Sequence, residues 1–271
     1  PTSENVTADD AKGRKADSNI VDLIKEYETK GFIKRYRTSK QLKAAIGKKA
    51  IFSQLMVIEK MRFDAGLGDY KLKRRTVLNL KKSSMSASTT LLHKAVLPRA
   101  TDAIHDILEL LVGLPKGHIV TQMVADVIDA FWLIPNHPRE RKYFAARYGN
   151  HFVAFLRTAQ GSRNAGLTWG TIVALIGRCI SSLFVSTGTK LLGQRCSEET
   201  NMQVYVDDPW NATRGEPART DTNLAMIALV WLALGMPLAF HKAMRGASLS
   251  RVGIKITVDS DGDQAIAEVP E

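Results

Sequence analysis

The segment that most constrains the fold is Met202–Trp210, in which every second residue up to Val206 is apolar. That spacing is typical of a strand with one buried face. Asp207 and Asp208 follow directly, and the next residue is a proline, which interrupts a central strand. The pattern therefore predicts a strand that ends in a turn carrying two neighbouring carboxylates.

Neighbouring carboxylates repel each other, so this turn has two interpretations. It is either a polar hairpin turn in water or a cation site, because hard divalent cations prefer carboxylate oxygens. A third carboxylate at the end of another strand favours the second interpretation. Ile119–Asp126 is a largely apolar run that ends in such a residue. Asp126, Asp207 and Asp208 would then form a set on two strands, the arrangement that binds two metal ions about 4 Å apart for phosphoryl transfer.

The charge of the chain indicates a polyanionic partner. The formal net charge is +11 and the isoelectric point is about 9.7. The excess of lysine and arginine is concentrated in the first hundred or so residues, while the later half is nearly balanced. Nucleic acid and an anionic membrane surface both fit such a charge. A solvated basic surface without a partner is the third possibility.

A basic hairpin is predicted within this part of the chain. Leu55–Phe63 and Lys73–Leu80 have strand patterns, and the glycine-containing segment 64–68 between them is a turn. A mobile hairpin of high positive charge is suited to clamping phosphates. It is equally typical of a solvated edge strand, since lysines protect edges from pairing. The cations concerned are Lys60, Arg62, Lys71, Lys73, Arg74, Arg75, Lys81 and Lys82.

One segment of the sequence suggests a membrane span, but we expect no membrane partner. Leu224–Phe240 has no charged residue, but its length is at the low end for a span, and Gly235 and Pro237 interrupt it. A buried helix of about ten residues followed by a turn explains the segment better. Cys179 and Cys196 have neither CxxC spacing nor a disulfide framework, and no signal peptide opens the chain. We therefore expect an intracellular protein of the nucleus or cytoplasm, not a secreted one.

Other segments have clear secondary-structure patterns. Residues 1–17 are polar and charged and are expected to be a disordered tail. Helices are predicted from Ser18 to Gly31 and after Ser39. The remaining predicted elements are a helix near 101–112, a strand His151–Leu156, helices Leu167–Val185 and 221–234, and a hairpin of Leu249–Val258 with Ala265–Val269.

Taken in order, these motifs resemble those of reverse transcriptases, and most closely those of retroelement or retrotransposon polyproteins. The resemblance covers roughly residues 50–258. It is carried by a basic strand followed by Asp126-x-x-Asp129-Ala130-Phe131, Gln160-Gly161, Tyr205-Val206-Asp207-Asp208, Lys242 and Val252-Gly253.

The resemblance implies an α+β fold, that of a right-hand polymerase with fingers, palm and partial thumb. Its palm would be an antiparallel sheet of three or four strands backed by helices. The implied division is a tail at 1–17, mainly fingers at 18–118 with a palm helix near 101–112, palm at 119–246 with a fingers insertion near 135–160, and a primer-grip hairpin with the start of the thumb at 247–271.

The resemblance also implies an activity, RNA-directed DNA polymerisation. The partners would be an RNA or DNA template with its primer and deoxynucleoside triphosphates, and the cofactor two Mg²⁺ or Mn²⁺ ions. The oligomeric state stays open. Two alternatives remain: a catalytically degenerate nucleic-acid-binding relic of the same fold, and a basic membrane-peripheral or scaffold protein.

Each motif has a role in the family. Asp126 and Asp207 would hold both metals with Asp208 in support, and Lys242 would donate a proton to pyrophosphate. Phe131 would be the aromatic gate under the sugar that excludes a 2′-hydroxyl. The other expected nucleotide-binding residues are Lys73, Arg75, Asp129, Ala130, Gln160, Gly161 and Tyr205, and the primer would be positioned by Val252 and Gly253.

Overall fold

The computed structural model describes residues 18–64, 68–90, 93–148, 151–184, 200–261 and 264–269. They form two compact units, each assembled from separate parts of the chain. Unit 1 comprises the described residues up to His93 together with Phe131–Ala165, and unit 2 comprises Lys94–Ala130 together with the described residues from Gly166 onward. The expected tail at 1–17 and Cys196 lie outside the described residues, whereas Cys179 is a free, exposed thiol.

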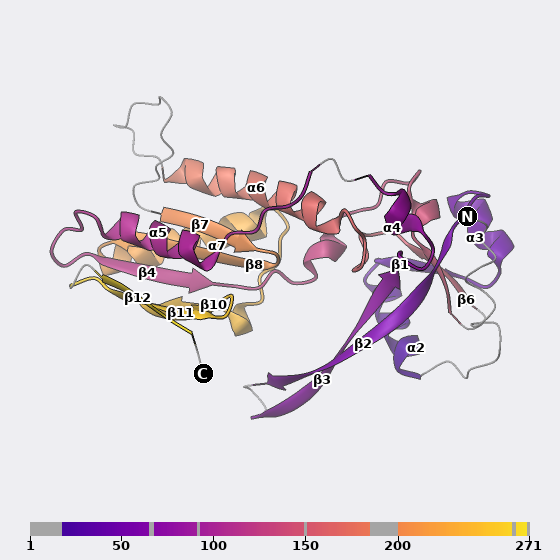
Figure 1. Ribbon diagram of the computed structural model, residues 1–271, viewed down its shortest axis with the longest axis horizontal. Coiled ribbons are helices and arrows are strands. Elements are labelled where there is room, and N and C mark those ends of the chain that lie inside the picture. The colour runs from indigo at the N-terminus through magenta and orange to yellow at the C-terminus, as the bar shows by residue number, and fades with distance from the viewer. Residues whose placement is uncertain are drawn as a thin grey trace. The chain divides into compact units, whose positions relative to one another are not determined.

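Unit 1, whose long β2–β3 hairpin is visible in Figure 1, is built on a five-stranded sheet in the order β1-β6-β5-β2-β3. Neighbouring strands are antiparallel except β2 and β5, which are parallel. The long β2–β3 hairpin places β3 at the edge of the sheet. The elements are α2 Ser18–Thr29, β1 Ile33–Tyr36, α3 Ser39–Ile46, β2 Phe52–Asp64, β3 Asp69–Asn79, α4 Met85–Ser88, η2 Arg141–Tyr143, β5 Ala145–Tyr148 and β6 His151–Phe155.

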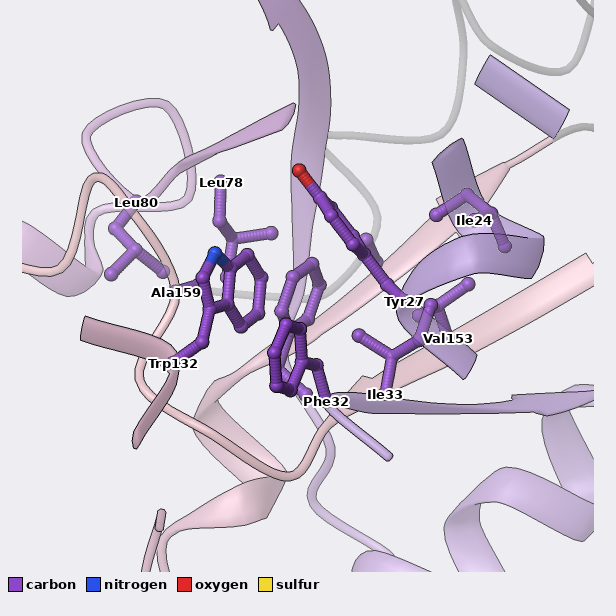
Figure 2. Packing of buried hydrophobic residues seen from close by; sticks show 11 residues of the cluster. Ile24, Tyr27, Phe32, Ile33, Leu78, Leu80, Trp132, Val153 and Ala159 are labelled. Atoms are coloured by element: carbon purple, nitrogen blue, oxygen red, sulfur yellow. The ribbon is translucent and has the colours of Figure 1, made fainter. Parts of the chain in front are cut away.

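An aromatic cluster forms the main core of unit 1 (Figure 2). The Trp132 ring stacks on Phe32 with 5.1 Å between centroids and an interplanar angle of 9°, and Tyr27 lies 4.8 Å from it. Phe155 of β6 stacks on the same indole at 6.0 Å. Aromatic pairs at such distances contribute beyond the area they bury. Trp132 therefore joins residues 131–165 to the first helix and strand.

Unit 2 contains two antiparallel sheets, a four-stranded sheet β7-β8-β4-β9 and a three-stranded sheet β10-β11-β12. The short helix η1, Ala130–Leu133, begins at the last residue of the first segment of this unit. The other elements are α5 Ala100–Leu111, β4 Ile119–Val124, α6 Ala165–Leu183, β7 Thr200–Tyr205, β8 Asp208–Gly215, α7 Pro217–Ala233, η3 Phe240–Lys242, β9 Met244–Gly246, β10 Ser248–Arg251, β11 Ile254–Asp259 and β12 Gln264–Glu268.

The two faces of the four-stranded sheet are covered by different elements. On one face Val124 and Trp210 join the core formed with α5 and the three-stranded sheet. On the other face Thr213 accepts a hydrogen bond from Asn223 of α7 at 3.0 Å. This alternation follows the strand period of two. The connection between β7 and β8 lies at one end of the sheet.

Two strand predictions are wrong. Leu249–Val258 is not one strand, because Val252 and Gly253 both have positive φ and turn the chain between β10 and β11. Pro209 does not end a strand but lies inside β8, between β7 and β4. It is tolerated because β4 has ended before Ala125, so the missing proline N–H removes only one bond at the margin of the ladder.

The apolar segment Leu224–Phe240 contains the second half of α7, whose Leu224, Ile227 and Trp231 are buried. A helix followed by a turn is thus what the structure shows there. Among the described residues a single helix, α6, has the length and apolar composition of a membrane span. A single helix of this kind is weak evidence for a membrane protein, because core helices of globular proteins share these properties.

Candidate active site

The segment Tyr205–Asp208, the aspartate turn, connects β7 to β8. The register pairs Tyr205 with Asp208, so Val206 and Asp207 form a two-residue hairpin loop. Val206 has a φ of 57° and Asp207 does not have a positive φ. This is the type II′ pattern, in which the first loop position is normally glycine. A β-branched residue in that conformation is strained by about 1–3 kcal/mol.

Two other segments of unit 2 hold the strained turn in place. The indole Nε1–H of Trp169, a buried residue of α6, donates a hydrogen bond to the Val206 carbonyl. The Val127 N–H donates to the Asp207 carbonyl at 2.9 Å. Strained backbone persists only where its surroundings determine it, and such positions concentrate at functional sites. The conformation of the turn is therefore fixed by its neighbours and not by its own sequence.

The same bonds bring Asp126 to the turn. Asp126 lies between Ala125, whose N–H donates to the Pro209 carbonyl at 3.0 Å, and Val127, which is bonded to Asp207. The residues directly before and after Asp126 are thus both hydrogen-bonded to the segment that carries Asp207 and Asp208. Asp126 and Asp207 are half-buried and Asp208 is exposed. The backbone thus brings the three aspartates to one edge of the sheet, the acidic edge.

A cation already lies at this edge. Lys242 Nζ, at the end of η3, is 2.7 Å from Asp126 Oδ2. The ion pair joins two residues that the sequence assigned to different tasks, metal binding and proton donation. It shows that the Asp126 carboxylate accepts a positive charge at hydrogen-bond distance.

The donor set has the right chemistry for a hard cation but is not a preformed site. Carboxylate oxygens are the ligands that Mg²⁺ prefers. The Asp126 carboxylate already pairs with a cation, the ammonium group of Lys242. Within the described residues, however, no three histidine, cysteine, aspartate or glutamate side chains are grouped closely enough to hold a metal ion. The predicted role of the three aspartates as metal ligands thus stays a prediction.

A polar network that the sequence did not reveal lies behind the aspartate turn. Arg251 Nη1 donates to Gln203 Oε1 at 3.1 Å, and Gln203 Nε2 donates to Asp106 Oδ2 at 2.6 Å. The Arg251 guanidinium also lies over the Trp210 ring, 4.7 Å from its centroid. The Trp210 indole in turn donates to Gln122 at 3.2 Å. The network connects α5, both strands of the hairpin and β10.

Burial sets the electrostatics of this network. It lowers the pKa of Arg251 to about 10, against the opposing attraction of Asp106 and Asp208. It raises the pKa of Asp106, and the hydrogen bond from Gln203 offsets part of that rise. Arg251 remains charged at neutral pH, and its guanidinium is attracted by the Asp208 carboxylate. No local sequence pattern indicates this network, because its members come from distant segments.

The predicted primer-positioning residues form a turn next to Arg251. Val252 and Gly253 have φ values of 46° and 78°, and the register pairs Arg251 with Ile254. Positive φ at both loop positions is the type I′ pattern of a tight hairpin. Val252 is 41% exposed. The buried arginine therefore anchors a hairpin whose tip is open to solvent.

In unit 1 the β2–β3 hairpin separates its charges between two faces. On one face Glu59 and Arg74 are cross-strand partners in an ion pair of 2.7 Å. On the other face the register places Lys60 opposite Lys73, and Arg75 lies on that face too. Like charges directly opposite each other destabilise a hairpin. Because β3 is an edge strand, some of its lysines are explained as protection against pairing with another chain. Such protection does not require two lysines to lie opposite each other.

Gln160 and Gly161 pack against the end of this hairpin. The Gln160 carbonyl accepts a hydrogen bond from the Leu78 N–H at 3.0 Å. Gly161 has a φ of +99°, and a Cβ there would lie 2.5 Å from the Leu78 carbonyl oxygen. The glycine is therefore required by the backbone of unit 1. Its predicted contact with a nucleotide is a separate matter, which stays a prediction.

The predicted site residues divide between the two units. Lys73, Arg75, Phe131, Gln160 and Gly161 belong to unit 1. Phe131 is half-buried at the start of the segment 131–165. Unit 2 contains Asp126, Asp129, Ala130, Tyr205, Asp207, Asp208, Lys242, Val252 and Gly253. Each unit thus contains part of the predicted site residues. The predicted nucleotide pocket would need residues of both units and stays a prediction.

Comparison with known proteins yields matches among solved structures alone. No protein-family profile and no curated protein matches the chain. Two of the matching structures are of a foamy viral protease–reverse transcriptase, one in complex with double-stranded DNA and the other with an RNA/DNA hybrid. The first has a TM-score of 0.57 at 17% identity, over 90% of this chain and 34% of that one. The second has a TM-score of 0.57 at 16% identity, over 89% and 26%.

At this level of identity the likeness shows the fold alone. The chain has a mixed α+β architecture that is polymerase-like at a coarse level. It spans about a third or less of the length of these solved proteins.

Proposed function

We propose that this chain is the polymerase domain of a reverse transcriptase. It adds deoxynucleotides to the 3′-hydroxyl of a primer under the direction of an RNA or DNA template. The observation that carries the proposal is the aspartate turn, a strained hairpin loop hydrogen-bonded to the strand end of Asp126. The likeness of the fold to proteins solved with DNA and with an RNA/DNA hybrid supports it.

In this proposal unit 1 corresponds to the fingers, and unit 2 to the palm with the beginning of a thumb. Asp126 and Asp207 would hold two Mg²⁺ or Mn²⁺ ions, with Asp208 in support. When bound, these ions lower the pKa of the primer hydroxyl and neutralise the leaving pyrophosphate. Lys242 Nζ, close to Asp126, would give a proton to that pyrophosphate. Val252 and Gly253 would position the primer end.

One rival function is favoured by a specific observation. Asp126 is neutralised by Lys242, and no three-ligand group is preformed among the described residues. Both facts fit a non-catalytic relic that binds nucleic acid without extending it. Primer extension in the presence of Mg²⁺ separates the two functions. A relic would bind primer–template and leave the primer at its original length.

The cationic face of the β2–β3 hairpin gives the first prediction. If Lys73 and Arg75 bind phosphates together with Lys81, replacing all three by glutamine will make the salt dependence of duplex binding shallower. The log–log slope should change by up to about 0.9 for each phosphate that the variant no longer neutralises. Binding is measured by fluorescence anisotropy over a range of salt concentrations. The control replaces three exposed lysines of the same unit: Lys40, Lys48 and Lys49.

The control should alter the slope less than the hairpin variant does. Equal slopes for the parent and the hairpin variant would show that the hairpin cations are merely solvated.

Phe131 gives the second prediction. A valine there is smaller and would leave room beneath the ribose, so Phe131→Val should admit ribonucleotides while deoxynucleotide incorporation falls less. An apolar site rejects an isostere with one added hydroxyl by roughly 10²-fold, and the aromatic ring would add steric exclusion to that. The ratio of the two incorporation efficiencies measures the effect. Identical ratios in variant and parent would remove Phe131 from the gate.

A further inference from the structure

The ion pair of Asp126 and Lys242 is built into the backbone around it. Lys242 Nζ lies 2.7 Å from Asp126 Oδ2, although 116 positions separate the two residues. The Ala239 N–H donates to the Asp126 carbonyl at 2.8 Å, and the Lys242 N–H donates to the Ala239 carbonyl at 2.9 Å. Through Ala239, the lysine is therefore tethered to the residue whose carboxylate it neutralises.

The pair is too exposed to contribute much to stability. The side chains of Lys242 and Asp126 are 42% and 25% exposed, and such ion pairs are weak in water. What the pair does change is the charge at one carboxylate oxygen. A divalent cation that approaches Asp126 meets an ammonium already bound there, and the two cations repel each other at contact distance.

We propose that Lys242 is a resident counter-ion that competes with a divalent cation for Asp126. Metal binding then requires the ammonium to leave the carboxylate. This inference rests on the proposed function, which makes Asp126 a metal ligand. The released lysine is a free cation at the edge of the site, and a triphosphate arriving with the metal is the anion that it would meet.

Titration of the whole chain with Mn²⁺ alone, without nucleotide or primer, tests the competition. Lys242→Gln removes the competing charge and should bind Mn²⁺ about threefold to tenfold more tightly than the parent. Lys242→Arg keeps the charge and should stay near the parent. Lys242→Met is a second neutral variant, so that the test does not depend on one substitution folding well.

Lys255→Gln is the matched control. Lys255 is a similarly exposed lysine of unit 2, with its Nζ 3.8 Å from a Glu268 carboxylate oxygen, and its removal changes the net charge by the same amount. Its Mn²⁺ affinity should equal that of the parent. Adding Asp126→Asn to Lys242→Gln should abolish the gain, because the competition takes place at that carboxylate.

The outcomes separate the two proposals. Equal Mn²⁺ affinity for the parent, Lys242→Gln and Lys242→Met would overturn the competition while leaving metal binding intact. Absence of Mn²⁺ binding in the parent and in both neutral variants would instead overturn the metal site of the proposed function, and with it this inference. Tighter binding by the neutral variants alone is the result that the proposal predicts.

Discussion

Asp126→Asn and Asp207→Asn are each expected to lower nucleotide incorporation by about a thousandfold or more. Asparagine keeps the size of the side chain but loses its charge, so it removes a metal ligand with little change in packing. Metal ions supply several kcal/mol of transition-state stabilisation, and each decade of rate corresponds to about 1.4 kcal/mol. The measurement is single-turnover primer extension at saturating primer–template. The affinity for primer–template, measured separately, should stay close to that of the parent.

Asp221→Asn is the control for these variants. Asp221 is a carboxylate of unit 2 that forms an ion pair of 3.0 Å with Arg245, and neither residue is assigned to the site. Its loss changes the net charge in the same way and should leave incorporation unchanged. Near-parental rates for Asp126→Asn would show that the acidic edge is a polar turn without a catalytic role.

The structure alters the expected effect of these variants on the free energy of unfolding. From the sequence, three repelling carboxylates predict that neutralising one of them preserves or increases stability. The ion pair with Lys242 makes Asp126 a special case, because Asp126→Asn also removes an attraction. For so exposed a pair the loss is about 0–1 kcal/mol. We therefore expect a free energy of unfolding equal to that of the parent or slightly lower.

Gly161→Ala is expected to destabilise the chain by about 2–4 kcal/mol. A φ of +99° is unfavourable for alanine, and the new Cβ would lie 2.5 Å from the backbone oxygen of Leu78 and 3.0 Å from Val77 Cγ1. Backbone strain and overpacking each contribute about 1–3 kcal/mol. Chemical denaturation measures the difference in the free energy of unfolding. Reduced incorporation in this variant would reflect folding and is no evidence that Gly161 touches a nucleotide.

Gly170→Ala provides the matched comparison. Gly170 lies within α6, and a Cβ there would have no atom within 4 Å. Alanine is a better helix former than glycine, so this variant should gain about 0.5–1 kcal/mol. If Gly161→Ala unfolded at the same denaturant concentration as Gly170→Ala, the close approach to β3 would be wrong.

The local patterns predicted most elements but not the turns whose conformation comes from the surroundings. Apolar alternation and paired aspartates located the hairpin of β7 and β8, since both signals lie within a few residues. The apolar alternation did not predict the break at Val252, because it continues on both sides of this residue and nothing local shows that a valine takes a positive φ. The prediction that Pro209 interrupts the strand was wrong, because the effect of a proline depends on where the neighbouring strand ends.

The site was predictable as a set of residue types but not as a set of contacts. The motifs indicated the carboxylates and Lys242, yet the ion pair between Lys242 and Asp126 depends on packing across 116 positions. Arg251 has no sequence signal at all, because its role comes from Gln203 and from burial. Long-range pairings of this kind need the tertiary structure.

The measurement that tests the central claim most directly is primer extension by the parent chain itself. Primer annealed to an RNA template and primer annealed to a DNA template are each supplied with one deoxynucleotide at a time, with and without Mg²⁺ or Mn²⁺. The proposed function predicts metal-dependent addition of the nucleotide complementary to the template, and no addition of the other three. A chain that binds primer–template but leaves the primer unextended under all these conditions would contradict it.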